Sequence, residues 1–247
     1  MARGVGEVIP ARKGRWFTMW FAGQARSRLR RTFGGVHIAG TAAARAAVVA
    51  GPVVVVSNHT AWWDPLLALY VSTHVLGSDA YAMMDAGNLR RLPFFGRVGA
   101  FGVDLARPED GAAAIRYAAR LLDRPGRLVW IFPQGHERPV TERPLGFRPG
   151  SAEIARVARS PVLPVALRYE FGGRERPDVL VDLGVSLPPD RDVVRARAAH
   201  EGAVTAGLDR LEATVRSGDL AGYDPVLRAP ADRLDAAAER MLSWLTG

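Results

Sequence analysis

The feature that most restricts the fold of this chain is a set of short apolar runs that alternate with helical patterns. The clearest run, Val53 to Val56, is unbroken, with Gly51-Pro52 before it and polar residues after it. Continuous apolar runs are typical of strands that are covered on both faces, as in parallel sheets flanked by helices. Strands are predicted at residues 53–57, 80–84, 98–103, 127–132, 162–169 and 179–187.

Helical patterns lie between these strands and after them. They are predicted at residues 65–73, 109–123, 150–158, 190–216 and 231–245. The alternation predicts an α/β fold with a largely parallel mixed sheet flanked by helices, and with the active groups at the strand ends. A length of 247 residues fits one such domain. We therefore expect a single catalytic domain over residues 36–247, preceded by an N-terminal arm over residues 1–35.

The arm differs from the rest of the chain in its charge. Residues 1–33 hold eight of the 33 cationic side chains but only one of the 25 acidic ones, and so carry most of the net charge of +8. Within them, residues 15–21 read Arg-Trp-Phe-Thr-Met-Trp-Phe. Tryptophan beside arginine suits the headgroup layer of an anionic membrane, which predicts an amphipathic membrane-associating helix. A nucleic-acid partner is disfavoured by the bulky apolar side chains, and a simple packed first helix is the alternative.

The sequence also bears on the compartment. No stretch has the roughly 18 uninterrupted apolar residues that a spanning helix needs. The nearest candidate, residues 42–56, is interrupted by Arg45 and by Gly51-Pro52. We find no secretory signal pattern near Trp16. Cysteine is absent, so disulfides and thiolate metal sites are excluded. We expect the body on the cytoplasmic face of the membrane, attached peripherally or monotopically.

His59 and Asp64 form the leading candidate for chemistry. They follow the apolar run of residues 53–56 at the end of a predicted buried strand, five positions apart. A neutral imidazole can accept a proton near pH 7, and a carboxylate on its far nitrogen orients the ring and stabilises its charged form. The structural alternative is a helix start, with Asp64 as N-cap and Pro65 at the first helical position.

Two further segments are candidates for ligand contact. Residues 126–139 form a strand that runs into a polar turn, where Gln134, His136 and Arg138 can face a ligand, or can simply be solvated. Arg97 and Arg107 flank a glycine-containing segment and can meet an anionic group. That segment lacks the spacing of a dinucleotide fingerprint, and the five histidines lack metal-ligand spacing, so we expect no metal and no bound cofactor.

Taken in order, these segments resemble the glycerolipid acyltransferase family, whose best-known members acylate lysophosphatidate. The N-H-x-x-x-x-D block is matched by Asn58, His59 and Asp64. The remaining blocks are resembled by Gly99 to Asp104, by Phe132-Pro133-Gln134-Gly135-His136-Glu137-Arg138 in place of F-P-E-G-T-R-S, and by Leu163-Pro164-Val165. Similar stretches fall at residues 93–96 and 149–155, so the resemblance spans about residues 50 to 170.

The resemblance implies a glycerol-3-phosphate acyltransferase-like fold and transfer of an acyl group from an acyl thioester to a hydroxyl of a membrane lipid. The acyl donor is coenzyme A or an acyl carrier protein, used as co-substrate. His59 is implied as general base, with Asp64 orienting it. Substrate contacts are implied for Asn58, Arg97, Arg107, Gln134, Gly135, His136 and Arg138.

Departures from the family pattern bear on the acceptor. Gln134 replaces a glutamate, and the arginine of the third block is moved by one position to Arg138. These changes favour a less anionic acceptor than lysophosphatidate, such as a glycolipid sugar hydroxyl or a glycosylated carotenoid. Two alternatives stay open: a non-catalytic lipid-binding protein of the same fold, and a thioesterase that uses the same pair on water.

Overall fold

An eight-stranded sheet lies at the centre of the computed structural model, which describes residues 8–104, 108–173, 175–229 and 244. The order of the strands is β4-β3-β5-β2-β6-β7-β1-β8. The five strands from β4 to β6 are mutually parallel, β7 is antiparallel to β6, and β8 is antiparallel to β1. The prediction of a largely parallel mixed sheet is therefore confirmed. The bounds are β1 Gly35–Ala39, β2 Val53–Ser57, β3 Asp79–Asp85, β4 Ala100–Val103, β5 Arg127–Ile131, β6 Val162–Glu170, β7 Asp178–Leu183 and β8 Asp224–Arg228.

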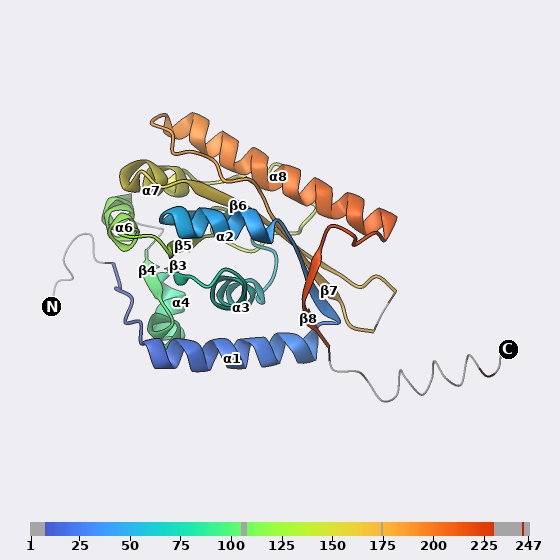
Figure 1. The fold of residues 1–247 in the computed structure, drawn as a ribbon. Helices are drawn as coiled ribbons and strands as arrows, with labels where there is room; N and C mark the ends of the chain where they lie inside the picture. The colour runs from blue at the N-terminus through green and yellow to red at the C-terminus, as the bar shows by residue number, and fades with distance from the viewer. Residues whose placement is uncertain (1–7, 105–107, 174, 230–243, 245–247) are drawn as a thin grey trace.

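Helices cover both faces of this sheet. Figure 1 shows α7 and α8 on one side of the sheet and α1 and α3 on the other. The bounds are α1 Arg15–Thr32, α2 Thr41–Ala50, α3 Asp64–Tyr70, the π-helical turn η1 Val71–Val75, α4 Ala86–Arg91, α5 Phe94–Arg97, α6 Pro108–Leu121, α7 Gly150–Ala158 and α8 Val193–Ser217. We call the side of α2 and α3 the α3 face, and the side of α6, α7 and α8 the α8 face.

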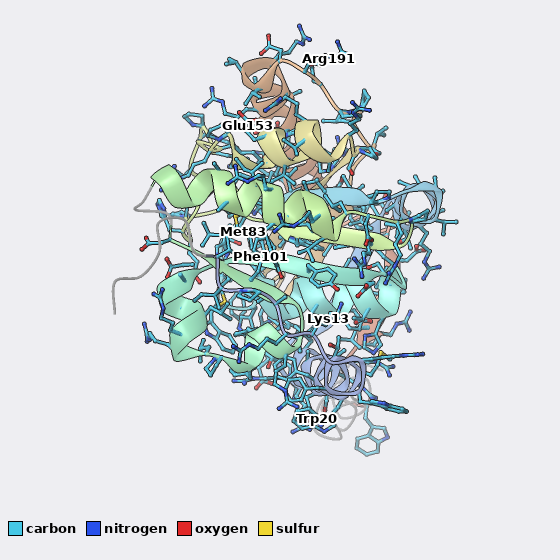
Figure 2. All side chains as sticks on the ribbon, turned by 90° about the vertical axis from the view of Figure 1, so that its left-hand side faces the viewer. Lys13, Trp20, Met83, Phe101, Glu153 and Arg191 are labelled. Carbon is cyan, nitrogen blue, oxygen red and sulfur yellow. The ribbon has the colours of Figure 1, made fainter. Side chains whose placement is uncertain are left out.

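The unbroken valine run of β2 is explained by these two layers. Val53 and Val55 pack in the apolar core of the α3 face, whereas Val54 and Val56 pack in the core of the α8 face. Successive side chains of a strand point to opposite faces, so a central strand covered twice needs apolar residues at every position. Farther along the parallel part of the sheet, Met83 of β3 and Phe101 of β4 are paired apolar residues and lie side by side in the middle of Figure 2.

The differences from the predicted elements have local causes. The strand predicted at residues 98–103 begins at Ala100, because Gly99 has φ +111° and follows the short helix α5. The strand predicted at residues 179–187 ends at Leu183. Five elements were not predicted: β1, α2, α4, α5 and β8, of which the last is a five-residue edge strand that contains Pro225. The helix predicted at residues 231–245 lies outside the described residues, apart from residue 244.

The N-terminal segment is packed against the body. Ile9 bridges to Gly102 at the edge strand β4, and α1 lies against α3. The side of α1 that faces the body carries Ala22, Ala25 and Leu29, which are buried. The division at residues 35 and 36 stays a prediction, as does a membrane role for α1. Within the described ranges, none of the helices combines the length and the apolar character needed to span a membrane.

Candidate active site

The site lies where the carboxyl ends of β2, β3 and β5 meet. Adjacent parallel strands end at the same edge of a sheet, and the loops that leave them converge there. The loop after β2 carries His59 and leads into α3, whose first residue is Asp64. The loop after β5 carries Gln134 and Gly135. The fold thus brings together two segments that are about 75 residues apart in the sequence, as the spacing of His59 and Gln134 shows.

His59 and Asp64 are in direct contact, with 2.7 Å between His59 Nδ1 and Asp64 Oδ2. The His59 side chain is 17% exposed, and the Asp64 side chain is 0% exposed. An ionised carboxylate only accepts hydrogen bonds, so the ring donates from Nδ1 and leaves Nε2 to accept a proton. The ring also stacks on Phe132, with 4.5 Å between the ring centroids. This is the geometry expected of a general base held by its orienting acid.

Asp64 accepts three further hydrogen bonds besides the one from His59. The amides of Thr60 and Ala61 donate to Oδ2, and Tyr169 Oη donates to Oδ1 across 2.6 Å. Burial, followed by the charge of Asp64, raises the pKa of Tyr169 well above its usual value, so its hydroxyl stays protonated and donates. A buried carboxylate with this many donors is stabilised and fixed in position.

The alternative role of Asp64 as a helix N-cap does not match this network. The residue at the cap position is Trp63, and no side-chain hydrogen bond caps α3. The amides bonded to Asp64 belong to Thr60 and Ala61, which precede α3 rather than form its first turn. Pro65 does lie in the first turn, as expected from its fixed φ. The carboxylate therefore serves the loop of His59 rather than the end of the helix.

Two residues for which substrate contacts were predicted hold the loop of His59 in place. The amide of the Asn58 side chain donates to the Leu167 carbonyl at 2.9 Å, and its oxygen accepts from the Leu167 amide at 2.8 Å. Gln134 Oε1 accepts from the His59 amide at 2.6 Å. Both side chains are buried. Asn58 and Gln134 therefore position His59 from opposite sides, through β6 and through the loop after β5.

A cavity of about 240 Å³ lies beside His59, between α3 and the strands β3 and β5. Its walls are largely apolar and include Leu69, Met83, Trp130 and Phe132. Gly135, which was predicted to contact substrate, lines it and has φ +79°. A side chain at this position would be strained in that conformation. The lining of the cavity is thus mostly apolar, with His59 among the polar side chains that reach it.

The predicted cations are distributed differently from the expectation. Arg97 lies over the ring of Phe17, with 3.9 Å from its Cζ to the ring centroid, and is not among the residues that line the cavity. Arg138 donates to Glu142 and to His136. His136 is exposed beside the loop of Gly135. Arg107 lies outside the described residues.

Arg148 is a cation that the sequence analysis missed. It lines the cavity beside Gly135, with its Cζ 3.0 Å from where a Cβ of Gly135 would be. The Arg148 amide donates to the Pro133 carbonyl, which ties the start of α7 to this loop. We call the side of the cavity formed by His59, Gly135 and Arg148 the mouth. The signal in the sequence was the position of Arg148 directly before Pro149-Gly150, in a stretch already noted for its family resemblance.

Metal chemistry has no ligand set among the described residues, where no group of three His, Cys, Asp or Glu side chains gathers at a distance suited to a metal ion. His59 can remove a proton from a hydroxyl at the mouth.

Comparisons with known proteins found a matching family model and a similar solved structure. A family model described as Acyltransferase matches residues 35–168. The solved structure of the 1-acyl-sn-glycerophosphate (LPA) acyltransferase PlsC from Thermotoga maritima is similar, with a TM-score of 0.57. It is 19% identical in sequence, and the match covers 79% of this chain and 78% of that chain. No curated protein sequence matches significantly. At this identity the structural similarity establishes the fold alone.

Proposed function

The chain belongs to the acyltransferase family, whose model covers more than half of its residues, and on that premise we propose that it transfers a fatty acyl group to a hydroxyl of a membrane lipid. The donor is an acyl thioester of coenzyme A or of an acyl carrier protein. The observation that carries the proposal is the contact of His59 with Asp64 at the mouth of an apolar cavity.

The proposed reaction is a direct displacement. His59 Nε2 accepts the proton of the acceptor hydroxyl while that oxygen bonds to the thioester carbonyl carbon. Asp64 holds the ring and stabilises the imidazolium that forms. The tetrahedral intermediate then breaks its C–S bond, and the leaving thiolate takes the proton from His59. Because the acceptor hydroxyl attacks the thioester directly, no covalent acyl-enzyme is needed. The acyl chain lies in the cavity throughout.

The acceptor is proposed to be a lysophospholipid or a glycolipid. Gln134 holds the His59 amide in this structure, so its difference from the family glutamate gives less reason to exclude a phosphorylated acceptor than the sequence suggested. Arg148 supplies a cation at the mouth, where an anionic headgroup would find a partner. Both observations support keeping lysophospholipids, lysophosphatidate included, among the candidate acceptors.

One assay tests the proposal against its alternatives. Thiol release from a long-chain acyl thioester is measured with and without a membrane lipid extract, and the lipids are then analysed by mass. Transfer predicts thiol release that depends on the extract, together with a lipid heavier by one acyl group. Release without any acceptor would indicate a thioesterase. Lipid binding without release would indicate a non-catalytic lipid-binding protein, and either result contradicts the proposed transfer.

We also propose that α1 attaches the protein to the cytoplasmic face of an anionic membrane. Trp16 is 89% exposed, Met19 and Trp20 are exposed on the same helix, and Arg15 lies beside them. Figure 2 places Trp20 at the opposite end of the molecule from Arg191, which precedes α8. Large exposed apolar side chains beside arginines are the pattern of interfacial helices.

Vesicle co-sedimentation tests this attachment. Replacing Trp16 and Trp20 with serine is expected to weaken binding to anionic vesicles, and high salt is expected to weaken it further. Val194→Ser is the matched control, because Val194 is also exposed but lies on α8. Equal binding of the double variant and the control would contradict a membrane role for α1.

A further inference from the structure

The inner part of the cavity contains a tryptophan at a position where a purely apolar side chain would suffice to contact an acyl chain. Trp130 is on β5, two residues before Phe132, so both side chains point to the same side of the sheet. Their ring centroids are 6.2 Å apart, and the Phe132 ring in turn stacks on His59. Trp130 therefore lies one ring farther into the cavity than the ring that contacts the proposed base.

The indole N–H of Trp130 has no acceptor among the residues that the structure describes. The residue is 1% exposed, and its Nε1 is one of the few buried side-chain polar atoms without a partner. Buried tryptophans normally pair this donor, because an unpaired buried donor has given up its hydrogen bonds to water without compensation. Trp130 lines the cavity while its Nε1 is itself buried, so an acceptor in the cavity reaches this donor after a small shift of the indole.

The helical wall of the cavity, opposite the sheet, contains an unusual turn. α3 passes at Val71 into the π-helical turn η1, and Ser72 of that turn is buried and lines the same cavity. Wider helical turns of this kind are uncommon and are frequent at functional sites. The adjoining positions Ala68, Ala80 and Ala82 are small, so space is left between the two walls. The inner cavity thus combines room with polar side chains on two elements.

We propose that the inner cavity is a subsite for an acyl chain that carries an oxygen substituent, either a hydroxyl or a keto group. The oxygen accepts the hydrogen bond of Trp130 Nε1, and the rest of the chain packs on the apolar walls. This inference rests on the proposed function, in that it places the acyl donor in the cavity. An unsubstituted chain of the same length fills the same space but leaves the indole donor unpaired, so it binds less tightly.

The subsite is tested by binding rather than by turnover. The full-length His59→Ala protein keeps the cavity but lacks the proposed base, so an acyl-CoA remains intact during calorimetry. Three acyl-CoA ligands of equal chain length are compared: one unsubstituted, one with a 3-hydroxyl and one with a mid-chain hydroxyl. We expect one of the two hydroxylated ligands to bind about threefold to tenfold more tightly than the unsubstituted ligand, as one neutral hydrogen bond predicts.

Two variants in the same background identify the donor. Trp130→Phe removes the indole N–H and keeps an aromatic ring, so the preference should disappear. Leu69→Val trims another cavity residue without removing a polar group, so overall affinity changes while the preference stays. Because each preference is a ratio within one protein, a change of cavity volume affects both ligands alike.

The outcomes separate this inference from the proposed function. Equal affinity for hydroxylated and unsubstituted chains in the His59→Ala protein, which keeps Trp130, would by itself overturn the subsite. A preference that survives in Trp130→Phe would also overturn it, since a water molecule or another residue would then pair the oxygen. A Trp130-dependent preference in a protein whose His59-containing form transfers no acyl group would leave the subsite standing and contradict the proposed function.

Discussion

Two histidines on opposite faces of the sheet show what makes one of them a candidate base. His59 lies at the sheet edge on the α3 face, pairs with Asp64 and lines a cavity. His200 lies on α8, is 2% exposed, and its Nδ1 has no partner among the described residues. Burial lowers the pKa of His200 to about 4, so it is neutral and sealed at physiological pH. His59 differs from His200 in having a carboxylate partner and access to a ligand. These two features make it a candidate base, since both residues are histidines.

The two faces also differ in their packing. On the α8 face, Gly207 lies so close to Ala166 that an added Cβ would be 2.8 Å from it, and Arg210 pairs with the buried Asp182 at 2.8 Å. On the α3 face, part of the space between α3 and the sheet is the cavity. Close packing favours stability, and a pocket is retained where a ligand is to bind. Substitutions on the two faces should therefore have separable effects on activity and on stability.

The two buried carboxylates Asp64 and Asp182 should differ most in their effect on the rate of acyl transfer. Asp64→Asn should lower the rate of acyl transfer by about 10³-fold to 10⁴-fold, because an amide no longer fixes the tautomer of His59 or stabilises its imidazolium. Asp182→Asn is the matched control on the α8 face, where loss of the Arg210 pair should lower the unfolding free energy but not the rate per folded molecule. Rates normalised to folded protein and chemical denaturation measure the two effects. Similar rates for both variants would abolish the distinction between the faces.

The next effect concerns acid stability. His200 binds a proton in the unfolded chain below pH 6.5 but in the folded protein only below about 4, so the native state loses stability as the pH falls between these values. At the acid end this costs about 3 kcal/mol. His200→Leu should remove that pH-dependent loss and leave acyl transfer at neutral pH unchanged.

Chemical denaturation of the wild type and His200→Leu from pH 7.5 to pH 4 measures the difference. His136→Leu is the control, since solvent already reaches that ring. If the gap between the wild type and His200→Leu stays constant over this range, His200 titrates like a free histidine. His200 would then not be the sealed, neutral histidine with which His59 is contrasted.

A smaller effect is expected at the hydroxyl that supports the proposed base. Tyr169→Phe removes the donor to Asp64 Oδ1 and should lower kcat about tenfold, with KM for the acyl donor unchanged, because the hydroxyl positions Asp64 and does not line the cavity. Tyr223→Phe is the control, since its hydroxyl contacts Thr214 of α8. Steady-state kinetics measure both. A rise in KM without a fall in kcat would assign Tyr169 to substrate binding instead.

Sequence reasoning worked best where the information is local. His59 and Asp64 are five positions apart and follow one strand, so their pairing could be expected from the order of residues. The valine run of β2 predicted a strand covered on both faces, and the two cores confirm it. Both cases depend on periodicity and spacing along one stretch of chain.

Roles that depend on tertiary contacts could not be predicted in this way. Tyr169 reaches Asp64 from β6, 105 positions away, and Asn58 is bonded to Leu167 at a similar separation. Gln134 in a polar turn suggested a ligand contact, yet its partner is the His59 amide. Arg148 follows no strand end, and only the fold brings it to the mouth. Spacing along the chain does not show that Tyr169, Asn58 and Gln134 make these contacts.

We propose above all that His59 activates an acceptor hydroxyl at the cavity mouth. Mass-resolved acyl transfer from a long-chain acyl thioester to membrane lipids, with the wild type and His59→Ala at equal folded concentration, measures this role. Circular dichroism confirms folding of both. We expect an acylated lipid with the wild type and at least about 10³-fold less with His59→Ala, because loss of the base also removes everything that Asp64 contributes through it. A folded His59→Ala protein that transfers at the wild-type rate would contradict this role.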